Sequence, residues 1–261
     1  MITVAIANQK GGVGKTTTAI NIATAMAAIG WRTLLLDLDP QGNASTGLGI
    51  SAADRGTSTY DLMIEGLDLA SCAHPTSIPS LQIVPATQDL SGAEVELVTV
   101  PDRSDRLRRA LHKTAARGRY DICFVDCPPS LGLLTLNALT AADTLLVPLQ
   151  CEFFALEGLS QLLKTVERVQ GQFNPDLGIV GVVLTMFDRR NRLTDQVADD
   201  VRDCLGPLVF ESVIPRNVRL SEAPSHGLPA LVYDHQCSGS RAYINLAREL
   251  IGRLPAQRIA A

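Results

Sequence analysis

The chain has 261 residues, 46% of them hydrophobic and 19% charged, which suits a folded α/β protein and excludes a mainly disordered one. Its 23 lysines and arginines against 27 acids leave a net charge of −4, so any contact with DNA must come from a local basic patch. The six cysteines form no CxxC pair, and no apolar run has the length of a signal-peptide core or a membrane span, so we expect reduced thiols in a cytoplasmic protein.

Short apolar runs rich in β-branched residues alternate with helical patterns along the chain. The runs are continuously apolar, which predicts strands covered on both faces and therefore a mostly parallel sheet. The predicted strands are Ile2–Ala7, Thr33–Asp37, Leu81–Pro85, Ile122–Asp126, Thr144–Leu149, Ile179–Thr185 and Leu208–Ile214. The predicted helices are Thr16–Ala28, Arg103–Arg117, Leu131–Leu139, Leu156–Val169, Thr194–Cys204 and Ser240–Leu254. This alternation predicts a doubly wound α/β fold with helices on both faces of the sheet.

The chain shows no internal linker, so we expect one domain over residues 1–254 and a short fraying tail over 255–261. The stretch Gly47–Ser80 is the least periodic, and we expect it to be irregular apart from one short helix at Thr59–Ile64. Gly30 follows the first predicted helix and fits the left-handed position at which many helices end.

A glycine-rich loop joins the first strand to the first helix, with the sequence Asn8-Gln9-Lys10-Gly11-Gly12-Val13-Gly14-Lys15-Thr16-Thr17. Glycines in this context let successive N–H groups point at a phosphate, and the helix N-terminus adds its dipole. We expect the following residues to contact the phosphates of a bound nucleotide: Gly11, Gly12, Val13, Gly14, Lys15, Thr16 and Thr17. Lys15 would reach the β- and γ-phosphates, and the Thr16 hydroxyl would bind Mg²⁺.

The segment KGGVGKT resembles the deviant Walker A loop of the ParA/MinD group of P-loop ATPases, in which an extra lysine, here Lys10, is the signature. The resemblance implies a P-loop NTPase fold, a three-layer sandwich that uses ATP and Mg²⁺. It also implies an ATP-dependent homodimer in which Lys10 reaches the phosphates held by the other subunit, so we assign Lys10 and Lys15 to catalysis.

Aspartates stand at the ends of two further predicted strands, where open α/β sheets bind their ligands. In the family that the chain resembles, the second aspartate of DLDPQGN, here Asp39, positions the attacking water, and Asp37 would support the shell of Mg²⁺. Asp126 ends the strand CFVD as a Walker B carboxylate would, which makes it the third candidate metal residue. Two plainer readings stay open: Asp39 could start a turn, and Asp126 could cap the next helix.

Two later strand ends, TMFD and IPRN, frame the adenine if the resemblance holds, which makes Met186, Pro215 and Asn217 candidate base contacts. Met186 and Pro215 could equally be packing residues. Arginines cluster after the same two strands, and the resemblance implies nonspecific DNA binding by the ATP-bound dimer. The candidate DNA contacts are Arg189, Arg190, Arg192, Arg216 and Arg219. Between positions 186 and 220 six acids balance six arginines, Arg202 included, so arginines bonded to solvent or carbonyls remain an alternative.

Further segments resemble the chromosomal ParA (Soj) type over nearly the whole chain, among them VDCPPSLG, PLQCEFFALEGL and IPRNVRLSEAPSHG. The resemblance implies an ATP-hydrolysing DNA-partitioning switch that is nucleoid-associated with ATP and has a ParB-type centromere-binding partner. Two alternatives are a MinD-like membrane-surface positioning ATPase and a P-loop metabolic ligase similar to dethiobiotin synthetase. The last helix lacks the strong basic face that membrane binding favours, so we expect no membrane partner.

Overall fold

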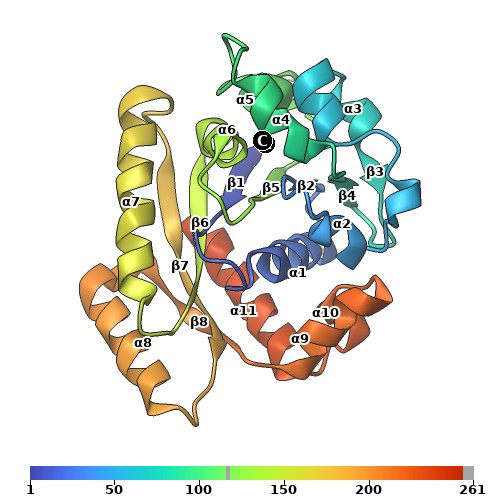
Figure 1. Ribbon diagram of the computed structural model, residues 1–261. Helices are drawn as coiled ribbons and strands as arrows, with labels where there is room; N and C mark the ends of the chain where they lie inside the picture. The colour runs from blue at the N-terminus through green and yellow to red at the C-terminus, as the bar shows by residue number, and fades with distance from the viewer. Residues whose placement is uncertain (116–117, 255–261) are drawn as a thin grey trace.

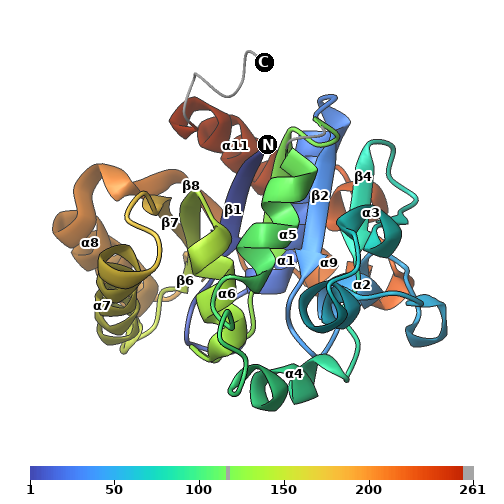
Figure 2. The same ribbon diagram turned by 90° about the horizontal axis from the view of Figure 1, so that it is seen from above.

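The computed structural model describes residues 1–115 and 118–254, so the predicted helix end at 116–117 and the predicted tail at 255–261 lie outside it. The described strands form one eight-stranded sheet in the order β3-β4-β2-β5-β1-β6-β7-β8. All pairs are parallel except β3 with β4, and helices cover both faces (Figures 1 and 2). The predicted doubly wound α/β fold is confirmed.

The elements agree closely with those predicted. The strands are β1 (Ile2–Ile6), β2 (Thr33–Asp37), β3 (His74–Pro75), β4 (Leu81–Val84), β5 (Ile122–Asp126), β6 (Thr144–Gln150), β7 (Gly178–Phe187) and β8 (Val209–Pro215). The helices are α1 (Lys15–Ala28), α2 (Asn43–Gly47), α3 (Leu69–Cys72), α4 (Leu90–Leu97), α5 (Arg106–Ala115), α6 (Leu133–Ala141), α7 (Ala155–Gln172), α8 (Arg192–Leu205), α9 (Val218–Glu222), α10 (Ala230–Tyr233) and α11 (Ser238–Arg253). Short helical turns are η1 (Ala52–Asp54), η2 (Asp61–Glu65), η3 (Gly206–Leu208) and η4 (Ala223–His226). All predicted strands and long helices are present.

The sheet separates two hydrophobic cores because its side chains alternate between faces. On one face, residues such as Ile6 and Phe124 pack against α1 and α11, where Tyr243 is fully buried. On the other face, residues such as Val125 pack against α5, α6, α7 and α8. Figure 2 shows these layers, with α11 on one side of the sheet and α5, α6 and α7 on the other side. Over the described residues, the helices are too short or too polar to cross a membrane.

The structure differs from prediction where helices are very short. The stretch Gly47–Ser80 holds η1, η2, α3 and β3, and the predicted Thr59–Ile64 helix is the π-helical turn η2. Helices α4, α9 and α10 were not predicted. Segments of four to eight residues carry too few turns for a clear apolar period, and tertiary contacts stabilise them instead. Gly30, in contrast, has φ of 95° directly after the end of α1, as predicted.

Four of the six cysteines are buried, as expected for structural thiols, whereas Cys204 is exposed and Cys237 half-buried. Burial raises the pKa of Cys72 and of Cys151 to about 11. Thiols held in the protonated form at neutral pH are poor nucleophiles and poor metal ligands. All six are free thiols, which agrees with the predicted reduced state.

Candidate nucleotide-binding and catalytic site

The predicted site residues meet at the carboxyl ends of the central strands. Parallel pairing places Ile6 beside Asp126 and Asp126 beside Asp37, so β1, β5 and β2 end side by side. The loop after β1 leads directly into α1, which starts at Lys15 (Figure 1). The glycine-rich loop, the Walker B position and the Asp37–Asp39 segment therefore share one edge of the sheet, where ligands bind in this class of fold.

The glycine-rich loop is held from two neighbouring strands. The Asn8 amide donates to the Pro148 carbonyl oxygen at 2.7 Å, and its Oδ1 accepts from the Lys10 N–H at 3.0 Å. The Thr185 hydroxyl donates to the Val13 carbonyl oxygen at 2.8 Å. Gly12 and Gly14 have φ of 75° and 87°, a left-handed conformation that needs glycine. This curled, anchored loop fits the predicted phosphate cradle.

The Lys15 ammonium lies inside this loop and donates to the Lys10 carbonyl oxygen at 3.0 Å. Burial lowers the pKa of Lys15, and the charges of Asp126 and Asp39 act in the opposite direction. Lys15 is thus a cation close to two carboxylates at the base of the loop. A phosphate chain bound there would gain a buried positive charge, which is strongest where water is excluded.

Asp126 is fully buried, and neither of its oxygens has a well-aligned hydrogen-bond partner among the described residues. Burial and the charge of Asp37 raise its pKa well above the usual range, whereas the Thr16 hydroxyl acts to lower it. An unsatisfied buried carboxylate is costly without a cation. Asp126 and Thr16 therefore fit Mg²⁺, as predicted from the sequence. The described residues contain no group of three or more acid, histidine or cysteine side chains that could hold a metal ion.

Asp37 holds the loop that follows β2. Its Oδ2 accepts from the Ser45 N–H at 2.8 Å and the Ser45 hydroxyl at 2.6 Å, and its Oδ1 accepts from the Asp39 N–H at 3.3 Å. Burial raises the pKa of Asp37 to about 6. Asp39 itself starts a turn, because its carbonyl oxygen accepts from the Gly42 N–H at 2.9 Å. The turn predicted as the plainer reading of Asp39 is present, and it leaves the Asp39 carboxylate near Lys15.

Lys10 lies outside the cradle that its own loop forms. Its ammonium makes an ion pair with Glu152, just beyond β6, and the two side chains are 45% and 46% exposed. An exposed pair of this kind contributes little stability, so the lysine can leave it at small cost. Sequence analysis did not assign Glu152, although it lies within the quoted PLQCEFFALEGL segment.

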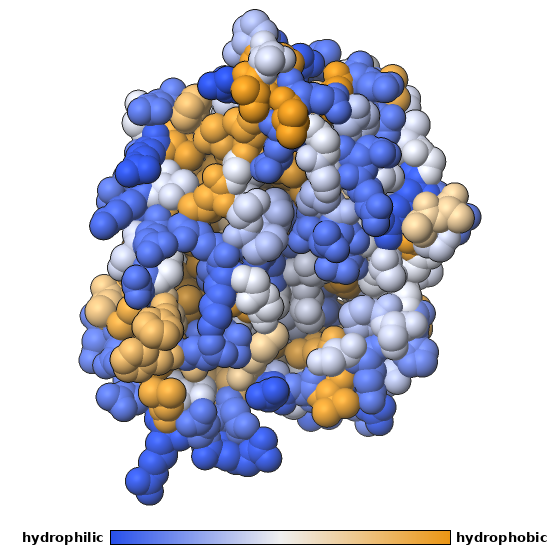
Figure 3. Space-filling model, viewed as in Figure 1, coloured by the Kyte–Doolittle hydropathy of each residue, from blue (hydrophilic) through white to orange (hydrophobic). Residues whose placement is uncertain are grey.

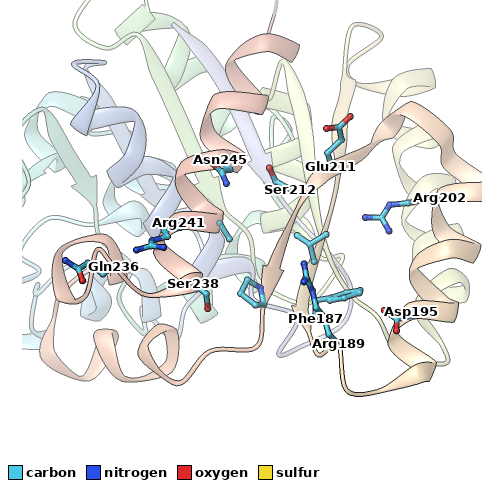
Figure 4. Close-up of a pocket in the computed structure, with 13 residues that line it drawn as sticks. Phe187, Arg189, Asp195, Arg202, Glu211, Ser212, Gln236, Ser238, Arg241 and Asn245 are labelled. Carbon is cyan, nitrogen blue, oxygen red and sulfur yellow. The ribbon is translucent and has the colours of Figure 1, made fainter.

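The candidate base contacts lie at the paired ends of β7 and β8. Met186 is 38% exposed and has φ of 50°, directly after the Thr185 that holds the loop. Asn217 caps α9 by accepting from the Arg219 N–H at 2.8 Å, and its amide donates to Ser238 at 2.9 Å. Pro215 borders an open cavity of about 1100 Å³ between α8 and α11. Figure 4 shows Phe187 and Arg189 at the strand-end side of this cavity.

The two arginine loops adjoin, as the predicted DNA patch requires. The Arg216 N–H donates to the Phe187 carbonyl oxygen at 3.0 Å. Arg190 pairs with Asp188 at 2.8 Å and holds the pKa of that carboxyl at about 2. Arg219 pairs with Glu222 at 2.9 Å and with Asp234 at 3.5 Å. The patch is thus partly neutralised by its own acids, whereas Arg216 and Arg192 have no ion pair among the described residues.

Several residues of the site could not be found from sequence patterns. Asn8 and Glu152 bond to partners about 140 positions away in the sequence. Ser45 bonds to Asp37 only after the loop folds back. None belongs to a periodic pattern, so no local signal marks it.

A family described as "AAA domain" matches residues 1–179. The chromosome partitioning protein ParA of Caulobacter vibrioides is 60% identical over 249 residues, which cover 95% of this chain and 93% of that protein. The sporulation initiation inhibitor protein Soj of Bacillus subtilis is 52% identical, covering 95% and 97%. A crystal structure of cobyrinic acid a,c-diamide synthase from Mycobacterium smegmatis with bound ADP and magnesium has a TM-score of 0.83 at 37% identity, covering 96% of this chain and 94% of that one.

Proposed function

Because the chain belongs to the ParA/Soj family of chromosome-partitioning P-loop ATPases, we propose that it is an ATP-hydrolysing DNA-partitioning switch. ATP with Mg²⁺ favours a homodimer, and the dimer binds nonspecific DNA. Hydrolysis, stimulated by a ParB-type centromere-binding protein, returns a weakly binding monomer. The names of the relatives support partitioning, and the geometry of the nucleotide site supports a switch driven by ATP.

The observation that carries the proposal is that two lysines of one loop have different positions and different partners. Lys15 is buried inside the cradle, whereas the Lys10 ammonium is at the surface, where the side chain is 45% exposed and pairs with Glu152. A surface lysine at the rim of a phosphate cradle can serve the triphosphate of a second copy. Charge that develops on the transferred phosphoryl group is stabilised by such cations. Dimerisation would then complete the catalytic site.

Each remaining site residue has a role in this scheme. Thr16 and Asp126 would hold Mg²⁺, which neutralises charge on the phosphates, and residues 11–17 would bind the phosphate chain. Asp39 orients the attacking water. Asp37 would support the hydration shell of Mg²⁺, and it also fixes the Asp39 loop through Ser45. Met186, Pro215 and Asn217 border the adenine at the ends of β7 and β8. The arginines of the two adjoining loops would contact DNA phosphates.

The experiment that tests the proposal measures molar mass and DNA binding with ATP, ADP or no nucleotide. Light scattering should give a dimer only with ATP and Mg²⁺, and a gel shift on unrelated DNA should appear only under the same condition. Lys10→Ala should remove the dimer-dependent hydrolysis while ATP still binds. ATP hydrolysis by a monomer with no DNA binding would instead favour a metabolic ligase, and ATP-dependent sedimentation with liposomes would favour a MinD-like ATPase.

A further inference from the structure

Arg55 is a buried arginine whose partners are all uncharged. It lies just after η1 and is 7% exposed. Its guanidinium donates to the Ala86 carbonyl oxygen at 2.9 Å, to the Gly42 carbonyl oxygen at 3.0 Å and to the Thr46 hydroxyl at 2.8 Å. Among the described residues it makes no ion pair. Burying a charge without a counter-ion costs free energy, so the hydrogen bonds that Arg55 makes must offset this cost.

All of these bonds end on the loop that carries Asp39 or on the strand end beside it. Gly42 and Thr46 belong to the segment that starts at the Asp39 turn and continues through α2. Ala86 lies two residues beyond β4, the neighbour of β2 in the sheet. One guanidinium therefore ties the Asp39 loop to a fixed point of the sheet, and its planar fork is suited to bonding several acceptors at once.

Two details indicate that the loop is built around this contact. Gly42 has φ of 63°, and a Cβ there would lie 2.0 Å from Arg55 Nη1, so only glycine leaves room for the guanidinium. Ala86 is also bonded through its other backbone group, because its N–H donates to the Ser45 hydroxyl at 3.1 Å, which itself donates to Asp37. Arg55 and Asp37 thus hold opposite sides of one short segment.

We propose that Arg55 is a positioning residue for ATP hydrolysis: it fixes the loop that places the Asp39 carboxylate against the attacking water. This inference rests on the proposed function, because only that function gives Asp39 a role in ATP hydrolysis. Among the described residues, the hydrogen bonds of the Arg55 side chain go to the carbonyl and hydroxyl groups of Gly42, Thr46 and Ala86, and none goes to the glycine-rich loop. Its loss should therefore slow the chemical step more than it weakens nucleotide binding.

The test compares Arg55→Lys and Arg55→Met with the unchanged chain. A single ammonium cannot replace three bonds of a planar fork, so both variants should lose about tenfold to a hundredfold in kcat. KM for ATP and the dissociation constant of a fluorescent nonhydrolysable ATP analogue should change less than about threefold, since the phosphate cradle is intact. Amide hydrogen exchange should become faster over residues 40–47 and stay unchanged over the glycine-rich loop.

Arg32→Met is the matched control. The Arg32 guanidinium also donates to a backbone carbonyl oxygen, that of Gly118 at 2.7 Å, and it makes an ion pair with Asp121. It lies directly before β2, at the amino end of the strand that ends at Asp37. Arg32→Met should leave kcat unchanged. Free guanidinium ion at millimolar concentration should restore part of kcat to Arg55→Ala and none to Asp39→Ala.

The outcomes separate the two proposals. If the unchanged chain does not hydrolyse ATP, the proposed function fails. If it does and Arg55→Lys keeps its kcat, or if exchange over residues 40–47 is unchanged, the role of Arg55 is wrong. An equal loss of kcat and of analogue affinity would make Arg55 a general scaffold residue, which also overturns the inference. Circular dichroism identifies a variant that does not fold, and Arg55→Lys then decides, since it keeps the charge and most of the volume.

Discussion

At the scale of single residues, the site depends on which lysine is buried. Lys10 and Lys15 belong to the same loop, but Asn8 directs the backbone so that Lys15 enters the cradle and Lys10 leaves it. The partner of Lys10 is Glu152, which directly precedes the exposed Phe153 and Phe154 before the start of α7. Figure 3 shows hydrophobic residues exposed on the surface at this end of α7. Releasing Lys10 from Glu152 is therefore one step of the proposed dimerisation.

Glu152→Gln should make that step easier. The variant keeps the shape of the side chain and removes the charge that holds Lys10 in its own protomer. An exposed ion pair is weak, so the ATP-dependent dimer should form at about two- to fivefold lower protein concentration. Sedimentation velocity over a dilution series measures the change, with Glu157→Gln on the exposed side of α7 as the control. Weaker dimerisation would mean that Glu152 contacts the second copy instead of restraining Lys10.

Asp39→Ala and Lys15→Ala should separate hydrolysis from binding. Asp39 lies behind the cradle at the start of its turn, so Asp39→Ala should still bind ATP and accumulate as an ATP-bound dimer. Lys15→Ala removes the buried cation of the cradle and should lose at least about tenfold in ATP affinity. Calorimetry with a nonhydrolysable analogue and a phosphate-release assay measure the two effects. An Asp39→Ala variant with the native hydrolysis rate would exclude its role in catalysis.

At the scale of elements, the features that a short stretch of sequence determines could be predicted. The features that depend on contacts between distant residues could not. The glycine-rich loop and the strands ending at Asp37 and Asp126 carry their signals within a few residues, and each was found at its predicted place. Arg55 and Glu152 contribute only after folding brings them against partners elsewhere in the chain. Helices such as α9 are defined by a cap and by packing, since five residues hold too little periodicity for a prediction.

The edge strand β8 gives an element-scale prediction. The Glu249 carboxylate on α11 accepts from the N–H groups of Glu211 at 2.9 Å and Ser212 at 3.0 Å, and it pairs with Arg253 at 2.9 Å. Burial favours its neutral form, but these bonds outweigh burial and lower its pKa. The carboxylate thereby satisfies backbone donors that an open sheet edge would offer to another chain.

Glu249→Gln should lower the free energy of unfolding by about 1 kcal/mol at pH 7. A depressed pKa means that this stabilisation is complete above the unfolded-state pKa of Glu249 and is lost as the pH falls through the lower folded-state value. The difference between the two proteins should therefore be full at pH 7 and small near pH 3. Urea unfolding at several pH values measures this difference, with Glu211→Gln on β8 as the control. A difference independent of pH would show that the charge of Glu249 is not responsible.

At the scale of the whole molecule, α1 connects the nucleotide site to the C-terminal helices. Its Thr18 hydroxyl bonds to the Tyr243 hydroxyl at 3.1 Å on α11, and Asn21 accepts from the Ala230 N–H at 2.9 Å on α10. Asn21 also donates to the carbonyl oxygen of Thr17, one of the predicted phosphate contacts, at 2.8 Å. The arginines of the candidate DNA patch lie on elements that follow β7 and β8, so the patch adjoins the candidate adenine contacts at the same edge of the sheet.

DNA binding by the ATP-bound dimer should reveal the patch through its dependence on salt. Each phosphate contact releases about 0.9 counterion per charge neutralised, and a symmetric dimer doubles every contact. Arg216→Ala should therefore reduce the slope of log K against log salt by about 2 and weaken binding equally on unrelated sequences. Arg219→Glu should abolish retention on DNA while ATP hydrolysis remains measurable, because it reverses a charge and frees Glu222 and Asp234 next to the DNA. Arg168→Ala, on α7, is the control. If the slope for Arg216→Ala matches that of the control, the two arginine loops do not bind DNA, and the surface must be sought elsewhere on the dimer.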